Sequence, residues 1–237
     1  MAIYKHKTRI RYSEIGPDSK LTLTALLDLF QNTSTFQSED LGVGVSYLLG
    51  KNRAWVLSSW QIVINELPSF ADEVVVETWS YGIKMAIGYR NFRLADSNGN
   101  TLACANSLWA YVDLAKALPI RCPIEECEMY GIEAPLKMEE MPRKIPVPEG
   151  MEELEPFEVK YYFIDTNNHV NNAKYIQAAT EYLPNDFTYK TVRAEYKKSA
   201  VLHDIIYPRI KKESDKITVT LSDSNGKIYT TIQFLEG

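Results

Sequence analysis

Leu94-Ala95-Asp96-Ser97-Asn98-Gly99 returns 127 positions later (Asp96 to Asp223) as Leu221-Ser222-Asp223-Ser224-Asn225-Gly226. Each hexapeptide lies between segments rich in β-branched and aromatic residues, which favour strands. The Asn-Gly step supplies the positive φ angles of a tight turn, so each hexapeptide predicts a β-hairpin. A hairpin that occurs twice in one chain indicates a repeated unit of antiparallel sheet.

Two further matches lie upstream in the same order. Ile15 matches Ile164 at a distance of 149 positions, and Asp72 matches Asp204 at a distance of 132 positions. Because the order is kept while the offset shrinks, we interpret the chain as an internal duplication whose second copy has shorter connections. Two unrelated α+β units that share common hairpin chemistry are the alternative.

Each copy contains one apolar stripe at helical spacing. The first stripe is Leu23, Leu26, Leu27 and Phe30. The second stripe is Ala173, Ile176, Ala179 and Leu183. Thr22 or Thr24 can cap the first helix, and the second helix is expected from about Asn172 to Leu183, before Pro184. The strands are expected at 3–12, 55–65, 72–81, 86–94 and 101–113, then at 157–164, 192–198, 204–211, 216–222 and 227–235.

The pattern predicts an α+β fold in which each sheet wraps one helix. Four prolines between residues 131 and 150 predict an extended linker. We therefore divide the chain into a domain at 1–130, a linker at 131–150 and a domain at 151–237.

Composition excludes several classes of protein. The chain has 237 residues, 45% apolar and 24% charged, as in an ordinary globular protein. A net charge of −5 argues against a nucleic-acid binder. No apolar run reaches the ~20 residues of a membrane span. The charged N-terminus lacks the apolar core of a secretory signal, so we expect a cytoplasmic protein.

The sparse cysteines Cys104, Cys122 and Cys127 fit a reducing compartment and predict neither a disulfide framework nor a zinc site. No metal and no cofactor are expected.

One of the three histidines stands out. His6 and His203 are interpreted as solvated side chains, whereas His169 ends the run Asp165-Thr166-Asn167-Asn168-His169 before the second helix. Asp165, Asn167 and His169 alternate, so in an extended segment they point the same way. The adjoining helix N-terminus can hold a developing oxyanion. Plain turn and capping chemistry is the alternative, and it explains Asn171 or Asn172 well.

Several motifs resemble the bacterial and plant plastid acyl-acyl-carrier-protein thioesterases over nearly the whole chain. They are Tyr12-x-Glu14-Ile15-Gly16-Pro17-Asp18, Trp55-Val56, Glu77-Thr78-Trp79, Ser107-Leu108-Trp109 and Asp165-x-Asn167-x-His169-Val170-Asn171-Asn172 with Lys174-Tyr175-Ile176 and Glu181. The resemblance implies two tandem hotdog domains. It also implies hydrolysis of the thioester between a fatty acyl chain and the phosphopantetheine of acyl carrier protein, with Asp165, Asn167 and His169 as the catalytic group.

One departure from the family pattern bears on the mechanism. Where plant members carry Glu and then Cys, this chain has Ser199 and Ala200, and its second half contains no cysteine. The nucleophile is therefore expected to be water, with either His169 or Asp165 as its base. Ser199 is a weaker candidate for a hydrogen bond within the site.

Two sets of residues are candidates for holding the substrate. By the resemblance, an acyl slot lies in the first domain, with the candidate lining Leu27, Phe30, Trp55, Leu57 and Trp60; a plain core is the alternative. An acidic carrier protein needs a basic surface for docking. The candidate cations are Lys5, Lys7, Arg9 and Arg11 on one strand face, and Lys197 and Lys198 with Arg193 on another. A solvated or edge-protecting face is the alternative for each row.

Other functions are compatible with the sequence: an acyl-CoA thioesterase, a non-catalytic acyl-binding hotdog protein, or a dehydratase. A homodimer stays open, although it is not needed, because one chain already holds two hotdog units. Neither a nucleic acid nor a membrane is expected as a partner.

Overall fold

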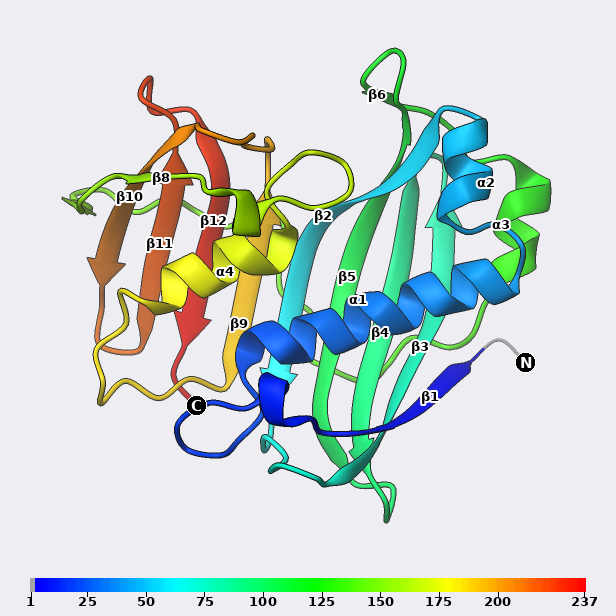
Figure 1. Cartoon of the computed structure of the whole chain (residues 1–237), viewed down its shortest axis with the longest axis horizontal. Coiled ribbons are helices and arrows are strands. Elements are labelled where there is room, and N and C mark those ends of the chain that lie inside the picture. Colours follow the sequence, from blue (N-terminus) through cyan, green and yellow to red (C-terminus); the bar gives the residue numbers. More distant parts are fainter. Residues whose placement is uncertain (1–2) are drawn as a thin grey trace. The chain divides into compact units, whose positions relative to one another are not determined.

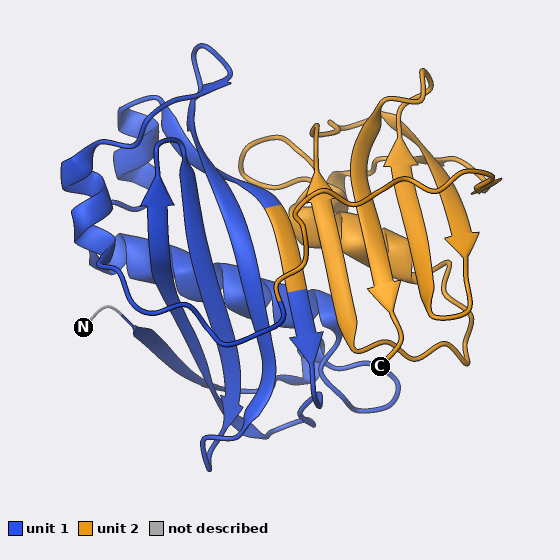
Figure 2. Ribbon diagram, turned by 180° about the vertical axis from the view of Figure 1, so that it is seen from behind, with its two compact units in different colours: residues 1–58, 62–139 blue, residues 59–61, 140–237 orange. Residues whose placement is uncertain are grey.

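The chain folds into two compact units (Figure 2). The computed structural model describes residues 3–237. Met1 and Ala2, the start of the charged N-terminal stretch, lie outside the described residues. Unit 1 comprises Met1–Ser58 and Ile62–Glu139, and unit 2 comprises Ser59–Gln61 and Glu140–Gly237.

Unit 1 is a helix lying across an antiparallel sheet (Figure 1). Its elements are β1 (Tyr4–Arg9), the 3₁₀ turn η1 (Tyr12–Glu14), α1 (Leu23–Asp40), α2 (Val45–Gly50), β2 (Arg53–Ile64, apart from Ser59–Gln61), β3 (Glu73–Lys84), β4 (Ile87–Asp96), β5 (Thr101–Asp113), β6 (Leu118–Pro119) and α3 (Ile124–Tyr130). The strand order is β1-β3-β4-β5-β2, and β6 pairs with β5. The connection from each of β3 and β4 to the next strand is a hairpin, which keeps neighbours in sequence adjacent in the sheet.

Local sequence explains why α1 forms and which face it buries. Thr22 is the N-cap, and its Oγ1 accepts the N–H of Ala25 at 3.2 Å. The predicted stripe faces inward, and Phe30 stacks on Phe92 of β4 with ring centroids 5.2 Å apart. Gly42, at φ +73°, turns the chain away after the helix. The prediction of this helix is confirmed.

Unit 2 repeats the plan with shorter elements. They are β7 (Glu152–Glu153), β8 (Phe157–Glu158), the 3₁₀ turn η2 (Tyr161–Phe163), α4 (Asn172–Thr180), β9 (Thr191–Tyr196), β10 (Ile205–Lys212), β11 (Lys216–Ser222) and β12 (Ile228–Leu235). The strand order is β9-β12-β11-β10-β7, and β8 pairs with β10. α4 lies across this sheet (Figure 1). Each unit therefore has the hotdog arrangement, and the predicted fold class is confirmed.

Several predicted boundaries are wrong: the strand expected at 3–12 ends at Arg9, and two boundaries in unit 2 also differ. The strand expected at 157–164 is only two residues long, because the chain then enters η2, where Phe163 N–H donates to the carbonyl of Lys160 at 3.0 Å. Aromatic residues favour strands only where a neighbouring strand is present to pack on, and here tertiary context overrides them. α4 ends at Thr180 rather than Leu183, so it has 9 residues against 18 in α1.

The two Asn-Gly hairpins are confirmed, and they share their turn chemistry. Gly99 has φ +85° and Gly226 has φ +75°. The carboxylate of Asp96 accepts the N–H of Asn98 at 2.9 Å, as that of Asp223 accepts the N–H of Asn225 at 3.0 Å. In each turn the aspartate side chain thus fixes the chain by accepting the backbone N–H two residues further on.

The stretch 131–150 is irregular but held in place at both halves. In unit 1, Trp79 Nε1 donates to the carbonyl of Ala134 at 2.9 Å, and Leu136 N–H donates to Asn91 Oδ1 at 2.9 Å. In unit 2, the buried N–H of Ile145 donates to Glu195 Oε2 at 3.1 Å. Among residues 3–237, none of the helices combines the length and the hydropathy that crossing a bilayer requires.

Candidate active site

A closed loop between η2 and α4 carries Asp165, Asn167 and His169. Asp165 N–H donates to the carbonyl of His169 at 2.8 Å, and Asn168 turns the chain with φ +60°. Asn171 then caps α4, because its Oδ1 accepts the N–H of Ala173 at 2.8 Å. The loop therefore ends at a helix N-terminus, as predicted.

The Asp165 carboxylate organises this loop. Its Oδ1 accepts the backbone N–H of Asn167 at 2.8 Å and that of His169 at 3.4 Å. The side chain is half-buried, whereas those of Asn167 and His169 are exposed. Within residues 3–237, no hydrogen bond joins the His169 ring to Asp165, Asn167 or Ser199. The structure thus brings Asp165 to the backbone of His169, while a side-chain pairing between the two stays a prediction.

Unit 1 builds the same loop from different residues. At the offset of 149 positions, Gly16 N–H donates to the carbonyl of Lys20 at 2.8 Å, and Ser19, at φ +62°, stands where Asn168 stands. Isolated bridges close the two loops, Ile15 with Leu21 in unit 1 and Ile164 with Val170 in unit 2. Gly16, Asp18 and Lys20 occupy the positions of Asp165, Asn167 and His169. Turn chemistry accounts for Asp165, as it does for Asp18, whose Oδ1 accepts the N–H of Lys20 at 3.0 Å. It does not account for the side chains of Asn167 and His169, because the same backbone forms without them in unit 1.

The segment after β9 lies against the His169 loop. The carbonyl of Ala200 accepts the N–H of Val170, the residue after His169, at 2.9 Å. Ser199 is exposed and Ala200 is fully buried. The positions where plant members carry Glu and Cys are therefore next to the loop, as the resemblance implies, but here they hold a short hydroxyl side chain and a methyl group.

The candidate acyl-lining residues are packed in the protein interior. Leu27, Phe30, Leu57 and Trp60 are each at most 3% exposed. Trp55 is half-buried and packs edge-on against Tyr111, with ring centroids 4.9 Å apart. Their role in holding an acyl chain stays a prediction.

Most of the candidate docking cations in the N-terminal row already have partners. Lys5 pairs with buried Glu77 at 2.8 Å, Arg9 Nε donates to the carbonyl of Ala71 at 3.2 Å, and Arg11 lies 3.5 Å from Glu14. Lys7 is exposed, and among residues 3–237 it has neither an ion pair nor a side-chain hydrogen bond. Lys7 is thus the cation of this row that is available to a partner.

In the second row, Lys197 and Lys198 are exposed and lie 3.6 Å from Glu195 and 3.2 Å from Asp223. Arg193 is 6% exposed and donates to Gln233 and to the carbonyl of Pro142. The expectation that Arg193 contributes to a surface row is wrong, because β9 is covered there.

Two buried carboxylates in unit 1 are tied to cations, and sequence inspection missed both. Burial by itself raises the pKa of Glu77, but hydrogen bonds from Arg93 and Lys5 outweigh it and lower the pKa. Burial likewise raises the pKa of Glu126, and hydrogen bonds from Tyr111 and Lys51 outweigh it. Tyr111 Oη donates to Glu126 Oε2 at 2.6 Å. Glu126 looks like one more charge in an acidic run, so its spacing alone gave no signal of burial.

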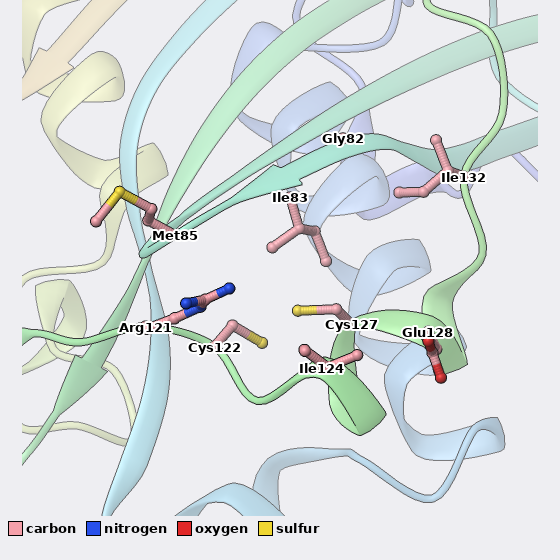
Figure 3. Close-up of a pocket in the computed structure, with 9 residues that line it drawn as sticks. All are labelled: Gly82, Ile83, Met85, Arg121, Cys122, Ile124, Cys127, Glu128 and Ile132. Atoms are coloured by element: carbon pink, nitrogen blue, oxygen red, sulfur yellow. The ribbon is translucent and has the colours of Figure 1, made fainter.

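A cavity of about 370 Å³ lies in unit 1 beside the C-terminal end of β3 (Figure 3). Ile83, Ile124, Ile132 and Arg121 line it, together with the thiols of Cys122 and Cys127. Burial raises the pKa of Cys122, which makes its thiol a poor nucleophile. None of the predicted catalytic or acyl-lining residues lines this cavity. Within the described part of the chain, no three His, Cys, Asp or Glu side chains are grouped to hold a metal ion.

Known proteins match the chain in sequence. The sequence model of the acyl-ACP thioesterase N-terminal domain matches residues 1–130, and that of the C-terminal domain matches residues 148–234. A chloroplastic acyl-[acyl-carrier-protein] hydrolase of Cuphea viscosissima is 29% identical over 196 residues, which are 77% of this chain and 46% of that protein. A chloroplastic palmitoyl-acyl carrier protein thioesterase of Arabidopsis thaliana is 26% identical over 201 residues, 77% of this chain and 47% of that protein. The chain spans about half the length of the curated relatives it matches.

Solved structures share the fold. An acyl-ACP thioesterase from Bacteroides thetaiotaomicron has a TM-score of 0.89 at 22% identity, covering 99% of this chain and 97% of that one. A 12:0-ACP thioesterase from Umbellularia californica has a TM-score of 0.87 at 17% identity, covering 99% and 97%. Together with the two domain matches, which cover most of the sequence, these findings show that the chain belongs to the acyl-ACP thioesterase family.

Proposed function

We propose that this protein hydrolyses the thioester of a fatty acyl chain carried on acyl carrier protein and releases the free fatty acid. The observation that carries the proposal is the pair of matching loops. The same backbone occurs twice, and only the loop of unit 2 carries Asp165, Asn167 and His169. The turn uses the Asp165 carboxylate but requires neither the Asn167 amide nor the His169 ring, so a function is the better explanation for these two side chains.

Water is the proposed nucleophile. Unit 2 contains no cysteine, and the position of the plant cysteine is the buried Ala200. A water oxygen adds to the thioester carbonyl carbon, the C–S bond then breaks, and the phosphopantetheine sulfur leaves as a thiol with the proton that the base took from water. The His169 side chain is exposed, so it is accessible to solvent water.

The hydrogen bonds support a division of roles between the two candidate bases. Asp165 Oδ1 already accepts two backbone N–H groups, whereas the His169 ring is exposed and, in residues 3–237, accepts and donates no hydrogen bond within the protein. His169 is therefore the base, and Asp165 shapes the loop that presents it. Asn167 positions the water or the carbonyl through its amide, and N–H groups at the start of α4 stabilise the oxyanion.

The remaining roles are assigned to the two domains and the linker. Residues 1–130 hold the acyl chain, residues 131–150 connect the two domains, and residues 151–237 carry the catalytic group. The acidic carrier docks on one of the two cation rows. Lys7 supports the N-terminal row, because it is exposed and, among residues 3–237, forms no ion pair, unlike Lys5 and Arg11.

A thiol-release assay tests the proposal. Purified protein is mixed with acyl carrier protein and with CoA, each bearing chains of several lengths, and the freed thiol is measured with a chromogenic disulfide. We expect turnover on the carrier-bound substrates and its loss in His169→Ala. Turnover on acyl-CoA alone would replace the carrier with CoA as the substrate, and no turnover on either would refute the enzyme.

A further inference from the structure

Tyr175 of α4 makes a buried hydrogen bond that no turn or cap requires. Its hydroxyl accepts the N–H of Ala200 at 2.7 Å. Tyr175 is 2% exposed and Ala200 is fully buried, so water reaches neither group. A buried N–H without a partner is unfavourable, so the Tyr175 hydroxyl is what makes this path of the chain possible.

Unit 1 shows what the same position looks like without this bond. At the offsets of 149 and 132 positions, Leu26 stands for Tyr175 and Pro68 stands for Ala200. The carbonyl of Pro68 accepts the N–H of Leu21 at 2.8 Å, as that of Ala200 accepts the N–H of Val170 at 2.9 Å. Proline has no N–H, so unit 1 needs no hydroxyl at the position of Leu26. The two units therefore hold the same backbone contact by different means, and only unit 2 uses a hydroxyl.

The bond reaches the candidate catalytic loop in two steps. Ala200 is fixed to Tyr175 through its N–H and to Val170 through its carbonyl, and Val170 follows His169 directly. The ring of Tyr175 is itself packed against Tyr196 and Tyr229, with centroids 6.2 and 6.5 Å away. Burial raises the pKa of Tyr175, so the group stays a neutral phenol.

We propose that Tyr175 is a positioning residue, which holds the 199–200 segment against Val170 and thereby fixes His169 for attack on the thioester. Tyr175 touches neither the substrate nor the attacking water. The kinetic consequence rests on the proposed thioesterase function, whereas the fixing of the loop does not.

The test removes first the Tyr175 hydroxyl and then the Ala200 N–H, for which unit 1 has a proline. Tyr175→Phe keeps the ring but leaves the Ala200 N–H unpaired. We expect kcat on acyl carrier protein to fall between about 10- and 100-fold, because small displacements of a catalytic group are costly, while KM changes little. Amide hydrogen exchange at Ala200 and Val170, measured by NMR, should accelerate at least about tenfold. Adding Ala200→Pro removes the unpaired N–H, so the double variant Y175F/A200P should recover much of the lost kcat and the slow exchange at Val170.

The matched control is Tyr189→Phe, which removes another tyrosine hydroxyl of unit 2, from a ring packed on Phe234 5.2 Å away. It should leave kcat and the exchange at Val170 unchanged. The proposal is overturned if Y175F lowers only the melting temperature and keeps kcat and exchange, or if Ala200→Pro brings no recovery. Should the wild type hydrolyse no acyl thioester, the proposed function fails, and the exchange of Val170 still decides whether Tyr175 holds the loop.

Discussion

Asn168 and Ser19 occupy equivalent places in the two loops and adopt the same left-handed backbone, at φ +60° and φ +62°. Neither is glycine, although this region is unfavourable for residues with a side chain. The shared left-handed conformation makes the two loops equivalent turns, with an asparagine at this position in unit 2 and a serine in unit 1.

That strain can be tested at both positions. Asn168→Gly and Ser19→Gly should each raise the stability of the protein or leave it unchanged, because glycine adopts positive φ without a steric cost. Asn168→Ala should lower it by about 1 kcal/mol, since alanine lacks the polar group that eases this conformation. Thermal unfolding, monitored by circular dichroism, gives the stabilities of the variants relative to the wild type. A higher melting temperature for Asn168→Ala would contradict this prediction.

His169→Ala should lower kcat by roughly 10²- to 10⁴-fold, the usual effect of losing acid–base assistance. The side chain is exposed, so folding should be little affected. Lys20→Ala, at the matching position of unit 1, is the control and should keep full turnover. Near-normal kcat in His169→Ala would remove this side chain from the mechanism.

The three cysteines can be replaced together without loss of the chemical step. All lie in unit 1, and Cys122 is 3% exposed in a small cluster with Leu48 and Tyr111. Replacement by Ala should therefore lower the melting temperature while kcat is kept. Mass spectrometry after rapid quenching would refute water as the nucleophile if it found an acyl group on one of these thiols.

Charge reversal of a candidate docking cation tests carrier binding separately from catalysis, and the contacts in the structure indicate which lysine to change. Lys5→Glu would place a carboxylate beside buried Glu77 and destabilise β1, so Lys7→Glu is the cleaner probe. If the N-terminal row docks the carrier, Lys7→Glu should raise KM for acyl carrier protein and leave turnover of a short carrier-free thioester unchanged. The effect should shrink at high salt, because screening acts beyond ~8–10 Å. The double variant Lys197→Glu/Lys198→Glu tests the other row. If neither this variant nor Lys7→Glu changes KM for acyl carrier protein, neither row docks the carrier.

Glu126 should make unit 1 sensitive to acid. Hydrogen bonds from Tyr111 and Lys51 hold its pKa in the folded protein below the ordinary 4.5. The folded state therefore binds this proton less readily than the unfolded chain, so the contribution to stability is present above pH 4.5 and is lost as the pH falls below it. Urea unfolding from pH 7 to pH 3 should show a shallower pH dependence in Glu126→Gln, together with lower stability at pH 7. An unchanged slope would contradict the argument.

Much of the fold was predictable, because it rests on local patterns. Thr22, the stripe through Phe30 and the two Asn-Gly turns each specify structure within a few residues. α2 and α3 were not predicted, because they have only 6 and 7 residues and depend on packing around Tyr111. The boundary of α4 was missed because Tyr182 and Leu183 continue the apolar pattern into a turn.

The position of the loop that carries the candidate site was predictable, but its contacts were not. His169 is conspicuous in a sequence with three histidines, and its place before a helix follows from the spacing. That Asp165 would bond the backbone of Asn167 rather than the His169 ring depends on the exact course of the loop. The bond between Tyr175 and Ala200 joins residues 25 positions apart and carried no signal, since a tyrosine in an apolar helix face is indistinguishable from core.

The loop of unit 1 has the backbone of the unit 2 loop but lacks the residues Asp165, Asn167 and His169. Its backbone already has the hydrogen bonds, the left-handed residue and the capped helix that present the three polar side chains in unit 2. The two units therefore share one loop backbone with different side chains, and Gly16→Asp, Asp18→Asn and Lys20→His would place the same three residue types in the loop of unit 1. Each unit thus contains a loop and a helix start of the same form, and under the proposed function only the copy in unit 2 would take part in the reaction.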